Sequence, residues 1–409
     1  MTERQSNIWH IPEGWEVKKL KQCFKFKNGK FFSNELREKT DCEYRYPVYG
    51  GNGIIGYCNE HLLDKETIII GRVGEYCGNV FKTQDKSWVT DNAMLVSDVL
   101  LKDFDINFWT VMLNSLHFNH YSDSTGQPKI TQGSIGAISV IYPSRIIEQS
   151  AIAAILSKVD ESIASVQASI SAAERLKKSL MQNLLTGRMK PDGTLRKDDE
   201  FYVDEKFGKV PKGWVVKKVK DLFYLNQNTL SNKTDANYRF RYITIESVNT
   251  EHIDFESCPE FSFKDSPGRA RRIIKDNDIL ISGVRPNLKA FAIYNKPDSN
   301  NWICSTGFHV LTAKENVCTQ FFFYQILSSI GASQFHSWVA GSNYPAIGDS
   351  DMKKMMLYVP EYKEQIIINQ KIEGISKMQI EKQNQIMILG KLKKSLMQNL
   401  LTGRVRVKM

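Results

Sequence analysis

The sequence predicts an α+β protein in which two mixed α/β domains are separated by a long antiparallel two-helix coiled coil, with a pseudo-twofold internal repeat. Three observations lead to this prediction. The chain has 409 residues, more than one hydrophobic core usually holds. Blocks of sequence recur in the same order in both halves. Each half also ends in a long heptad pattern of apolar residues.

The repeat is clearest at the end of each half. The segment LKKSLMQNLLTGR occupies residues 176–188 and returns unchanged, 216 residues later, at 392–404. A second pair comes earlier in each half, IPEGWEVKKLKQCF at 11–24 and VPKGWVVKKVKDLF at 210–223. Because both pairs keep their order, we interpret the chain as two copies of one module.

A third, looser pair consists of Gly-Gln-Pro-Lys-Ile at 126–130 and Asn-Tyr-Pro-Ala-Ile at 343–347, each followed by an apolar run. Short β-branched runs bounded by Gly, Asn or Pro indicate strands between these blocks, as at 67–70 and 278–282. The predicted division is a first domain at 1–145, a first long helix at 146–192, a second domain at 193–361 and a second long helix at 362–409.

Apolar residues in both long segments recur at alternating steps of four and three, the heptad pattern of packed helices. The second series is in phase with the first but is polar at Gln379 and Lys382. Gly187 and Gly403 are placed for left-handed C-caps. We expect two helices of about 40 residues, about 60 Å long, packed antiparallel with the domains at opposite ends. Two independent helices, each on its own domain, are the alternative. The predicted seam contains Ile152, Leu156, Val159, Leu180, Leu184, Ile372, Ile375, Leu396 and Leu400.

The composition is that of an ordinary globular protein, with 42% apolar and 24% charged residues. The 55 Lys and Arg against 45 Asp and Glu leave a net charge of +10, which favours a polyanionic partner. The longest strongly apolar run, 151–156, is too short to cross a bilayer. The N-terminus lacks the apolar stretch of a signal peptide. We therefore expect no membrane association and a cytoplasmic location.

Motifs for covalent chemistry are not convincing. The seven cysteines form no Cys-x-x-Cys pair and are odd in number, so we predict neither a disulfide framework nor a metal site. Residues 51–56 match G-x-G-x-x-G, but no amphipathic helix opens after them, and a turn between strands explains them better. We find no phosphate-binding loop and no convincing catalytic triad. The prediction is that the chain has no catalytic residue and no cofactor of its own.

Basic residues interleaved with aromatic residues are the most informative polar signal. Such groups can neutralise phosphates, while Arg, Asn and Gln on neighbouring loops can read base edges. Arginines that follow predicted strands, and polar loops before the apolar runs, are the preferred base readers. The alternative for each cluster is the solvated face of an amphipathic strand. The DNA-binding candidates are Lys25, Lys27, Lys30, Arg45, Asn52, Arg72, Gln127, Lys129, Arg239, Arg241, Arg269, Arg271, Arg272, Arg285, Asn343 and Tyr344.

The identical helix ends suggest a partner-docking face. Seam residues would be retained for packing, yet residues that point away from the seam also recur, while the upstream parts of the helices differ. One partner surface that binds twice would explain this, and recent gene conversion is the alternative. The predicted docking residues are Lys178, Gln182, Asn183, Lys394, Gln398 and Asn399.

The three repeated segment pairs are accompanied by Glu-Gln at 148–149 and 364–365. With this order of segments, the chain resembles the DNA-specificity subunit of type I restriction-modification systems over essentially its whole length. The resemblance implies two target-recognition domains, each reading half of a bipartite, asymmetric site in double-stranded DNA, with the paired helices as a ruler. It also implies that two methyltransferase subunits, which would carry S-adenosylmethionine, dock on the helices, and that restriction subunits join them. Because the loop at 343–346 differs from that at 126–129, the domains should read different sequences. The alternatives are a self-contained methyltransferase or nuclease and a non-DNA coiled-coil scaffold.

Overall fold

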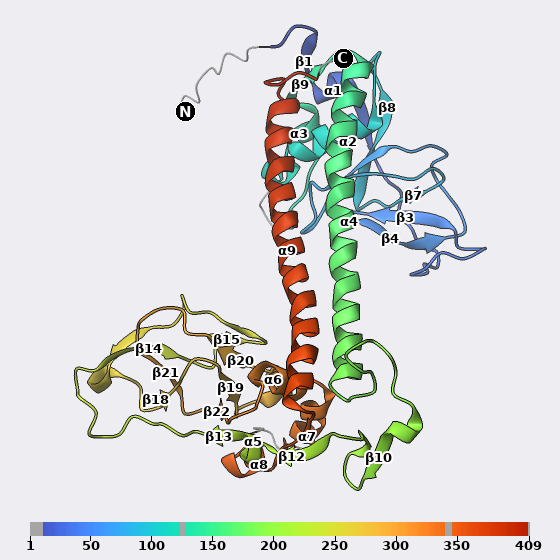
Figure 1. The fold of residues 1–409 in the computed structure, drawn as a ribbon. Helices are drawn as coiled ribbons and strands as arrows, with labels where there is room; N and C mark the ends of the chain where they lie inside the picture. Colours follow the sequence, from blue (N-terminus) through green and yellow to red (C-terminus); the bar gives the residue numbers. More distant parts are fainter. Residues whose placement is uncertain (1–10, 123–126, 340–345, 408–409) are drawn as a thin grey trace. The chain divides into compact units, whose positions relative to one another are not determined.

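The chain forms two compact units in the computed structural model, which describes residues 11–122, 127–339 and 346–407. The first unit consists of residues 1–168 and 383–409, and the second of residues 169–382. Two helices of 39 residues, α4 (Ile146–Leu184) and α9 (Tyr362–Leu400), each contribute to both units (Figure 1). The prediction of two helices about 40 residues long is therefore confirmed. None of the helices described is long and apolar enough to cross a membrane.

The first unit contains an antiparallel four-stranded sheet in the order β2-β8-β5-β6, a three-stranded sheet in the order β4-β3-β7, and the pair β1-β9. Its helices are α1 (Leu20–Cys23), α2 (Ile106–Ser115) and α3 (Gln132–Gly136), with the 3-10 turn η1 (Phe118–Tyr121). Its strands are β1 (Trp15–Lys19), β2 (Phe24–Asn28), β3 (Tyr46–Gly50), β4 (Gly53–Cys58), β5 (Ile68–Gly71), β6 (Val80–Lys82), β7 (Trp88–Val89), β8 (Ala93–Val99) and β9 (Ser139–Pro143).

The second unit contains four-stranded sheets in the orders β13-β22-β19-β20 and β17-β14-β21-β18, and the pairs β10-β11, β12-β23 and β15-β16. Its helices are α5 (Val219–Leu222), α6 (Thr319–Leu327), α7 (Ser329–Val339) and α8 (Asp349–Lys354), and its 3-10 turns are η2 (Asp198–Glu200), η3 (Phe263–Asp265) and η4 (Pro286–Leu288). Its strands are β10 (Phe201–Asp204), β11 (Gly208–Pro211), β12 (Val215–Lys218), β13 (Phe223–Leu225), β14 (Arg239–Ile243), β15 (Val248–Asn249), β16 (His252–Ile253), β17 (Glu260–Ser262), β18 (Ala270–Ile273), β19 (Asp278–Ser282), β20 (Phe291–Tyr294), β21 (Trp302–Ser305), β22 (Phe308–Ala313) and β23 (Met356–Val359).

The two units share one sheet topology, which confirms the predicted repeat and the mixed α/β content. The orders β2-β8-β5-β6 and β13-β22-β19-β20 match strand for strand. The registers also match, because Ile70 on β5 pairs with Met94 on β8, and Ile281 on β19 pairs with His309 on β22. The two-stranded pairs β1-β9 and β12-β23 also correspond. The modules differ in a further sheet, which has three strands in the first unit (β4-β3-β7) and four in the second (β17-β14-β21-β18).

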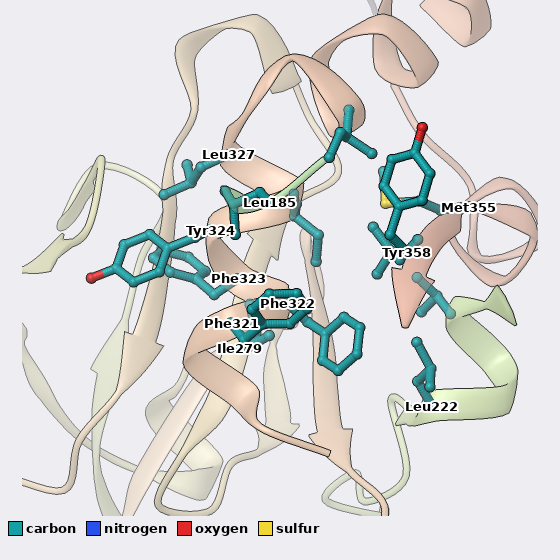
Figure 2. Close-up of a cluster of buried hydrophobic side chains, with 14 of the residues drawn as sticks. Leu185, Leu222, Ile279, Phe321, Phe322, Phe323, Tyr324, Leu327, Met355 and Tyr358 are labelled. Carbon is teal, nitrogen blue, oxygen red and sulfur yellow. The ribbon is translucent and has the colours of Figure 1, made fainter. Parts of the chain in front are cut away.

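Both long helices contribute to the hydrophobic core of each unit. In the first unit Ile152 and Leu156 of α4 lie in the same core as Leu400 and Leu401 that end α9. In the second unit the end of α4 and the start of α9 lie in one core with the aromatic residues of α6. Figure 2 shows Leu185, just after α4, with the aromatic side chains of α6. Burial of one large apolar side chain is worth about 1.5–3 kcal/mol, so these contacts fix the helix ends firmly in their units.

The predicted seam follows the least exposed stripe of each helix. Ile152, Leu156, Leu184, Ile372 and Leu400 are buried. The remaining predicted positions, Val159, Leu180, Ile375 and Leu396, are partly exposed. Ionic contacts also occur on this stripe, as in the first unit, where Lys393 Nζ lies 2.6 Å from Asp160 Oδ1.

The repeated Pro-x-Gly-Trp motif covers the end of a long helix in each unit. Gly187 and Gly403 adopt left-handed conformations with φ of 69° and 70°, as predicted for C-caps. A Cβ atom at Gly403 would come within 2.5 Å of Pro12, and one at Gly187 within 2.3 Å of Pro211. The proline therefore packs so closely on the helix end that only glycine fits, which gives both repeated motifs a structural reason.

A carboxylate closes each of these helix ends, fully buried in the first unit and partly buried in the second. In the first unit Glu148 accepts hydrogen bonds from Arg406, at 2.6 and 2.9 Å, and from Trp15 Nε1, at 3.3 Å. In the second unit Glu364 accepts from Arg196, at 2.8 Å, and Trp214 Nε1, at 2.9 Å. We call each Trp-Glu-Arg group a clamp. The tryptophan of the Pro-x-Gly-Trp motif is thus fixed by polar as well as apolar contacts.

Candidate nucleic-acid interface and helix-end grooves

Two loops of the first unit are joined along one edge of the common sheet. The loop after β5 carries Arg72, and the loop before α3 carries Gln127 and Lys129. Ile130 N donates to Arg72 O at 2.9 Å, and Gly74 N donates to Pro128 O at 3.0 Å. Val73 and Lys129 form an antiparallel bridge. The structure therefore brings Arg72, Gln127 and Lys129 together, although 55 residues separate the two loops in sequence.

The glycine-rich turn between β3 and β4 joins the same place. A Cβ atom at Gly71 would come within 2.4 Å of Gly51 O, so the turn lies directly against the end of β5. Asn52 is exposed in this turn and accepts a hydrogen bond from Asn79 Nδ2 at 3.2 Å. The G-x-G-x-x-G match thus reflects close backbone packing in a hairpin, as the sequence analysis predicted, and it places Asn52 beside the loop of Arg72.

The second unit repeats this arrangement with different side chains. Ile347 N donates to Gly283 O at 2.8 Å, and Val284 forms an antiparallel bridge with Ala346. Arg285 follows in a left-handed conformation with φ of 48° and is exposed. Its guanidinium makes no hydrogen bond or ion pair with the residues that the structure describes. The predicted Asn343 and Tyr344 lie outside the described residues.

The arginines of the second unit differ in what they contact. Arg241 donates to the carbonyl oxygens of Phe255 and Cys258, both at 2.9 Å, and its guanidinium lies 4.9 Å from the Trp302 ring centroid. Arg271 donates to Ser266, Pro267 and Ala270 and lies over Phe263. These two guanidinium groups hold loops of their own domain. Arg239 pairs with Glu260 at 2.9 Å, Arg272 contacts Thr229 at 3.2 Å, and Arg269 is exposed.

Three lysine candidates of the first unit, Lys25, Lys27 and Lys30, lie apart from the joined loops in sequence. Lys25 and Lys27 are exposed on β2, and Lys30 is exposed just after it. Lys27 lines a surface depression together with Asp64, Glu66 and Asp98, so acidic groups surround it. Arg45 is exposed and lies 5.4 Å from the ring centroid of Tyr46.

The repeated helix-end residues line one groove in each unit. In the second unit a groove of 630 Å³ separates α4 from the end of α6 and the start of α7. In the first unit a groove of 670 Å³ separates α9 from the end of α2. The equivalent lysine, methionine and glutamine side chains line both, and they are Lys177, Lys178, Met181 and Gln182 in one and Lys393, Lys394, Met397 and Gln398 in the other.

The predicted docking residues divide into two groups. Lys178, Gln182, Lys394 and Gln398 are exposed and line the grooves. Asn183 and Asn399 are partly buried and line neither groove. Asn183 Nδ2 donates to Ser179 O at 2.9 Å, one turn earlier in the same helix. The repeated face is therefore the wall of an open groove, and its asparagines belong to the helix end.

Cys23 and Cys58, and His61 three residues after Cys58, have ordinary surroundings. Burial raises the pKa of the Cys23 thiol to about 11. Cys58 donates to Glu60 O, and His61 Nε2 lies 3.1 Å from Asp64 Oδ1. Across residues 11–122, 127–339 and 346–407, no three His, Cys, Asp or Glu side chains gather as they would around a metal ion.

Comparison with known proteins identifies the class. The model of the type I restriction modification DNA specificity domain matches the chain twice, over residues 12–175 and 211–389. The chain belongs to the family of type I restriction-modification DNA-specificity subunits. The two matches correspond to the two halves of the internal repeat.

Relatives and solved structures agree with this assignment. The chain is 34% identical over 167 residues to the EcoprrI specificity subunit of Escherichia coli, a match that spans 41% of this chain and 40% of that subunit. It is 22% identical over 424 residues to the MjaVIII specificity subunit of Methanocaldococcus jannaschii, covering 97% of this chain and 94% of that one. The fold is similar to the crystal structure of the S subunit from M. genitalium, with a TM-score of 0.58, 16% identity and full coverage of both chains.

Proposed function

We propose that this chain is the DNA-recognition subunit of a type I restriction-modification complex and that it reads a bipartite, asymmetric target. The observation that carries the proposal is the repeated pair of joined loops. In the described residues these loops present exposed Gln127 and Lys129 in one unit and exposed Arg285 in the other. Asn52 lies on the adjacent turn between β3 and β4, and Arg72 is half-buried and donates to Asp91 O at 3.0 Å. Different side chains on the same backbone frame would read different half-sites, because base contacts specify while phosphate contacts position.

The chain itself performs recognition, and catalysis belongs to its partners. We infer that two methyltransferase subunits with S-adenosylmethionine supply methyl transfer and that restriction subunits join them. We propose a cytoplasmic location for this complex, since its substrate is DNA. A self-contained enzyme and a non-DNA scaffold are not favoured, because both halves match the DNA specificity domain.

A selection from random DNA tests this proposal. The chain is mixed with labelled random duplexes, with and without its methyltransferase subunits, and the retained sequences are read. We expect two short conserved half-sites separated by a spacer of fixed length. Retention without any sequence preference would contradict the proposal, since the phosphate contacts alone give sequence-independent binding.

We further propose that the two long helices form an antiparallel coiled coil, related by a pseudo-twofold axis, that sets the spacing of the half-sites. Each helix has 39 residues, about 60 Å at about 1.5 Å per residue. The seam positions of α4 and α9 are buried or partly buried in the same four-three pattern.

The two grooves support docking of one methyltransferase subunit at each helix end. Their walls combine apolar atoms of the methionine with exposed charge of the lysine, a mixture common at protein interfaces. Because the same residues occur twice, one surface of the partner can dock in both grooves.

Charge reversal in the grooves tests this docking. The double variant Lys178→Glu and Lys394→Glu should weaken assembly with methyltransferase subunits at least about tenfold, which is about 1.4 kcal/mol. Both side chains are exposed, so the fold should be unaffected. The matched control is Lys158→Glu with Lys377→Glu, two exposed lysines on the same helices that line neither groove. Equal co-purification of both double variants would refute the docking face.

A further inference from the structure

His309 lies beneath the joined loops of the second unit. It is on β22, is 5% exposed and has both ring nitrogens within hydrogen-bond distance of a partner. Nδ1 lies 3.0 Å from Asp349 Oδ1, and Nε2 lies 3.0 Å from Ile347 O. A Cβ atom at Gly283 would come within 2.8 Å of Nε2, so the ring also lies directly against the loop that leads to Arg285.

Both partners of the ring are hydrogen-bond acceptors. A carbonyl oxygen has no proton, and Asp349 already accepts from Asn226 Nδ2 at 2.9 and 3.0 Å. Asn226 is oriented in turn, because its Oδ1 accepts from Val310 N at 2.9 Å. A neutral imidazole has one N–H and can satisfy one of the two acceptors, whereas an imidazolium satisfies both.

We propose that His309 is a positioning residue for DNA recognition and that it acts as an imidazolium, donating to Asp349 and Ile347 at the same time. This inference rests on the proposed function. The ring ties three backbone segments together, namely β22, the start of α8 with the residues just before it, and the loop from Gly283 to Arg285. Through the Ile347–Gly283 hydrogen bond and the Val284–Ala346 bridge it fixes the loop that carries Arg285.

The other charged groups around the ring are engaged elsewhere. Asp351, in the first turn of α8, accepts from Gly348 N at 3.3 Å. Asp278, on the neighbouring strand β19, accepts from Thr312 Oγ1 and Lys275 N at 2.7 Å each. Lys353 and Lys354 are exposed at the end of α8. Among the described residues, Asp349 is the charged partner within hydrogen-bond distance of His309.

The first unit lacks this device and therefore serves as an internal control. Met94 occupies the position of His309, because the pairs Ile70–Met94 and Ile281–His309 are equivalent in the two sheets. Met94 is fully buried and has no proton to exchange. The loop that it underlies is joined in the same way, through Ile130 N and Arg72 O. Any pH dependence that arises from His309 should therefore be confined to one half-site.

Base discrimination by the second domain should depend on pH because the His309 ring can lose one of its two N–H protons. At low pH the ring donates to both acceptors. Without one of its two N–H protons, the ring turns a nitrogen lone pair toward either Asp349 Oδ1 or Ile347 O, and that hydrogen bond is lost. The loop of Arg285 is then held less firmly, and the second domain should discriminate less well between bases, while the first domain is unaffected.

The test compares base discrimination in each half-site as a function of pH. The complex with its methyltransferase subunits is given the selected target and targets with single-base changes in either half. From mildly acidic to mildly alkaline buffer, discrimination in the half read by the second domain should fall about tenfold, equivalent to about 1.4 kcal/mol, and stay constant in the other half. His309→Met should lower discrimination in that half alone and abolish its pH dependence. The control His252→Gln, an exposed histidine of the same unit, should behave as wild type.

Several outcomes would overturn the inference. Equal pH dependence in both halves, or an unchanged pH profile in His309→Met, would remove His309 from recognition. A second measurement needs no variant. Nitrogen NMR of the full chain with isotope-labelled histidine should show both His309 ring nitrogens protonated at neutral pH. A neutral ring would refute the proposal. If the wild-type complex discriminates in neither half, the proposed function fails instead, so the two failures are distinguishable.

Discussion

Replacement of Arg406 by alanine is expected to destabilise the first unit by about 3 kcal/mol. The substitution leaves the carboxylate of Glu148, whose side chain is 3% exposed, without its cationic partner. Loss of one partner of a buried ion pair costs about 3–5 kcal/mol, and the lower end applies here because the Arg406 side chain is 40% exposed. The remaining hydrogen bond from Trp15 does not neutralise the charge.

Thermal unfolding of the full chain measures this effect. A unit of this size loses roughly 2–4 °C per kcal/mol, so the transition of the first unit should move down by roughly 6–12 °C. The matched control is Lys209→Ala, which breaks the ion pair between Lys209 and Asp198. The Lys209 side chain is 61% exposed and the Asp198 side chain 91% exposed. That exposed ion pair should contribute about 0–1 kcal/mol to the free energy of unfolding. Equal shifts in the two variants would show that the clamp does not hold the helix end.

Lengthening both helices by one heptad is expected to change the preferred spacer between the half-sites. Seven residues inserted before Leu176 and before Leu392 add about 10 Å at about 1.5 Å per residue. The insertions keep the heptad phase of both helices. The apolar contacts that each helix end makes with the core of its unit should remain unchanged. Since one base-pair step is about 3.4 Å, the selected spacer should grow by about one to three base pairs with both half-sites unchanged.

Two residues inserted at the same places are the matched control for the heptad. They rotate the seam out of phase, so assembly should be lost even though the added length is small. Retention of the original spacer at full affinity by the heptad variant would show that the helices do not set the distance.

The repeat allowed much of the fold to be predicted from the sequence. Identical helix ends and the four-three pattern located α4 and α9, and the β-branched run at 278–282 is β19. These features depend on local periodicity, which a single sequence displays. The apolar segment 104–118 contains α2, and the apolar segment 320–330 contains α6 after its first residue and the start of α7.

The contacts that hold the candidate site could not be predicted in the same way. Arg196 and Arg406 fill the same place in the two clamps, but they lie 210 residues apart in sequence. The helix ends repeat at an offset of 216 residues, so the sequence repeat does not align the two arginines. Arg241 and Arg271 resemble DNA contacts in sequence but donate to their own backbone. The pairing of His309 with Asp349 joins residues 40 apart through sheet register. Such choices depend on tertiary packing rather than on local pattern.

An exchange of one globular segment shows whether each domain reads its own half of the target. Residues 193–361 are replaced by the corresponding segment of another specificity subunit, and the methylated sites of a host that expresses the complex are mapped. We expect that one half-site changes to that of the donor, while the other half-site and the spacer stay the same. A map in which both half-sites change, or in which neither changes, would contradict the claim that each globular segment reads its own half of the target.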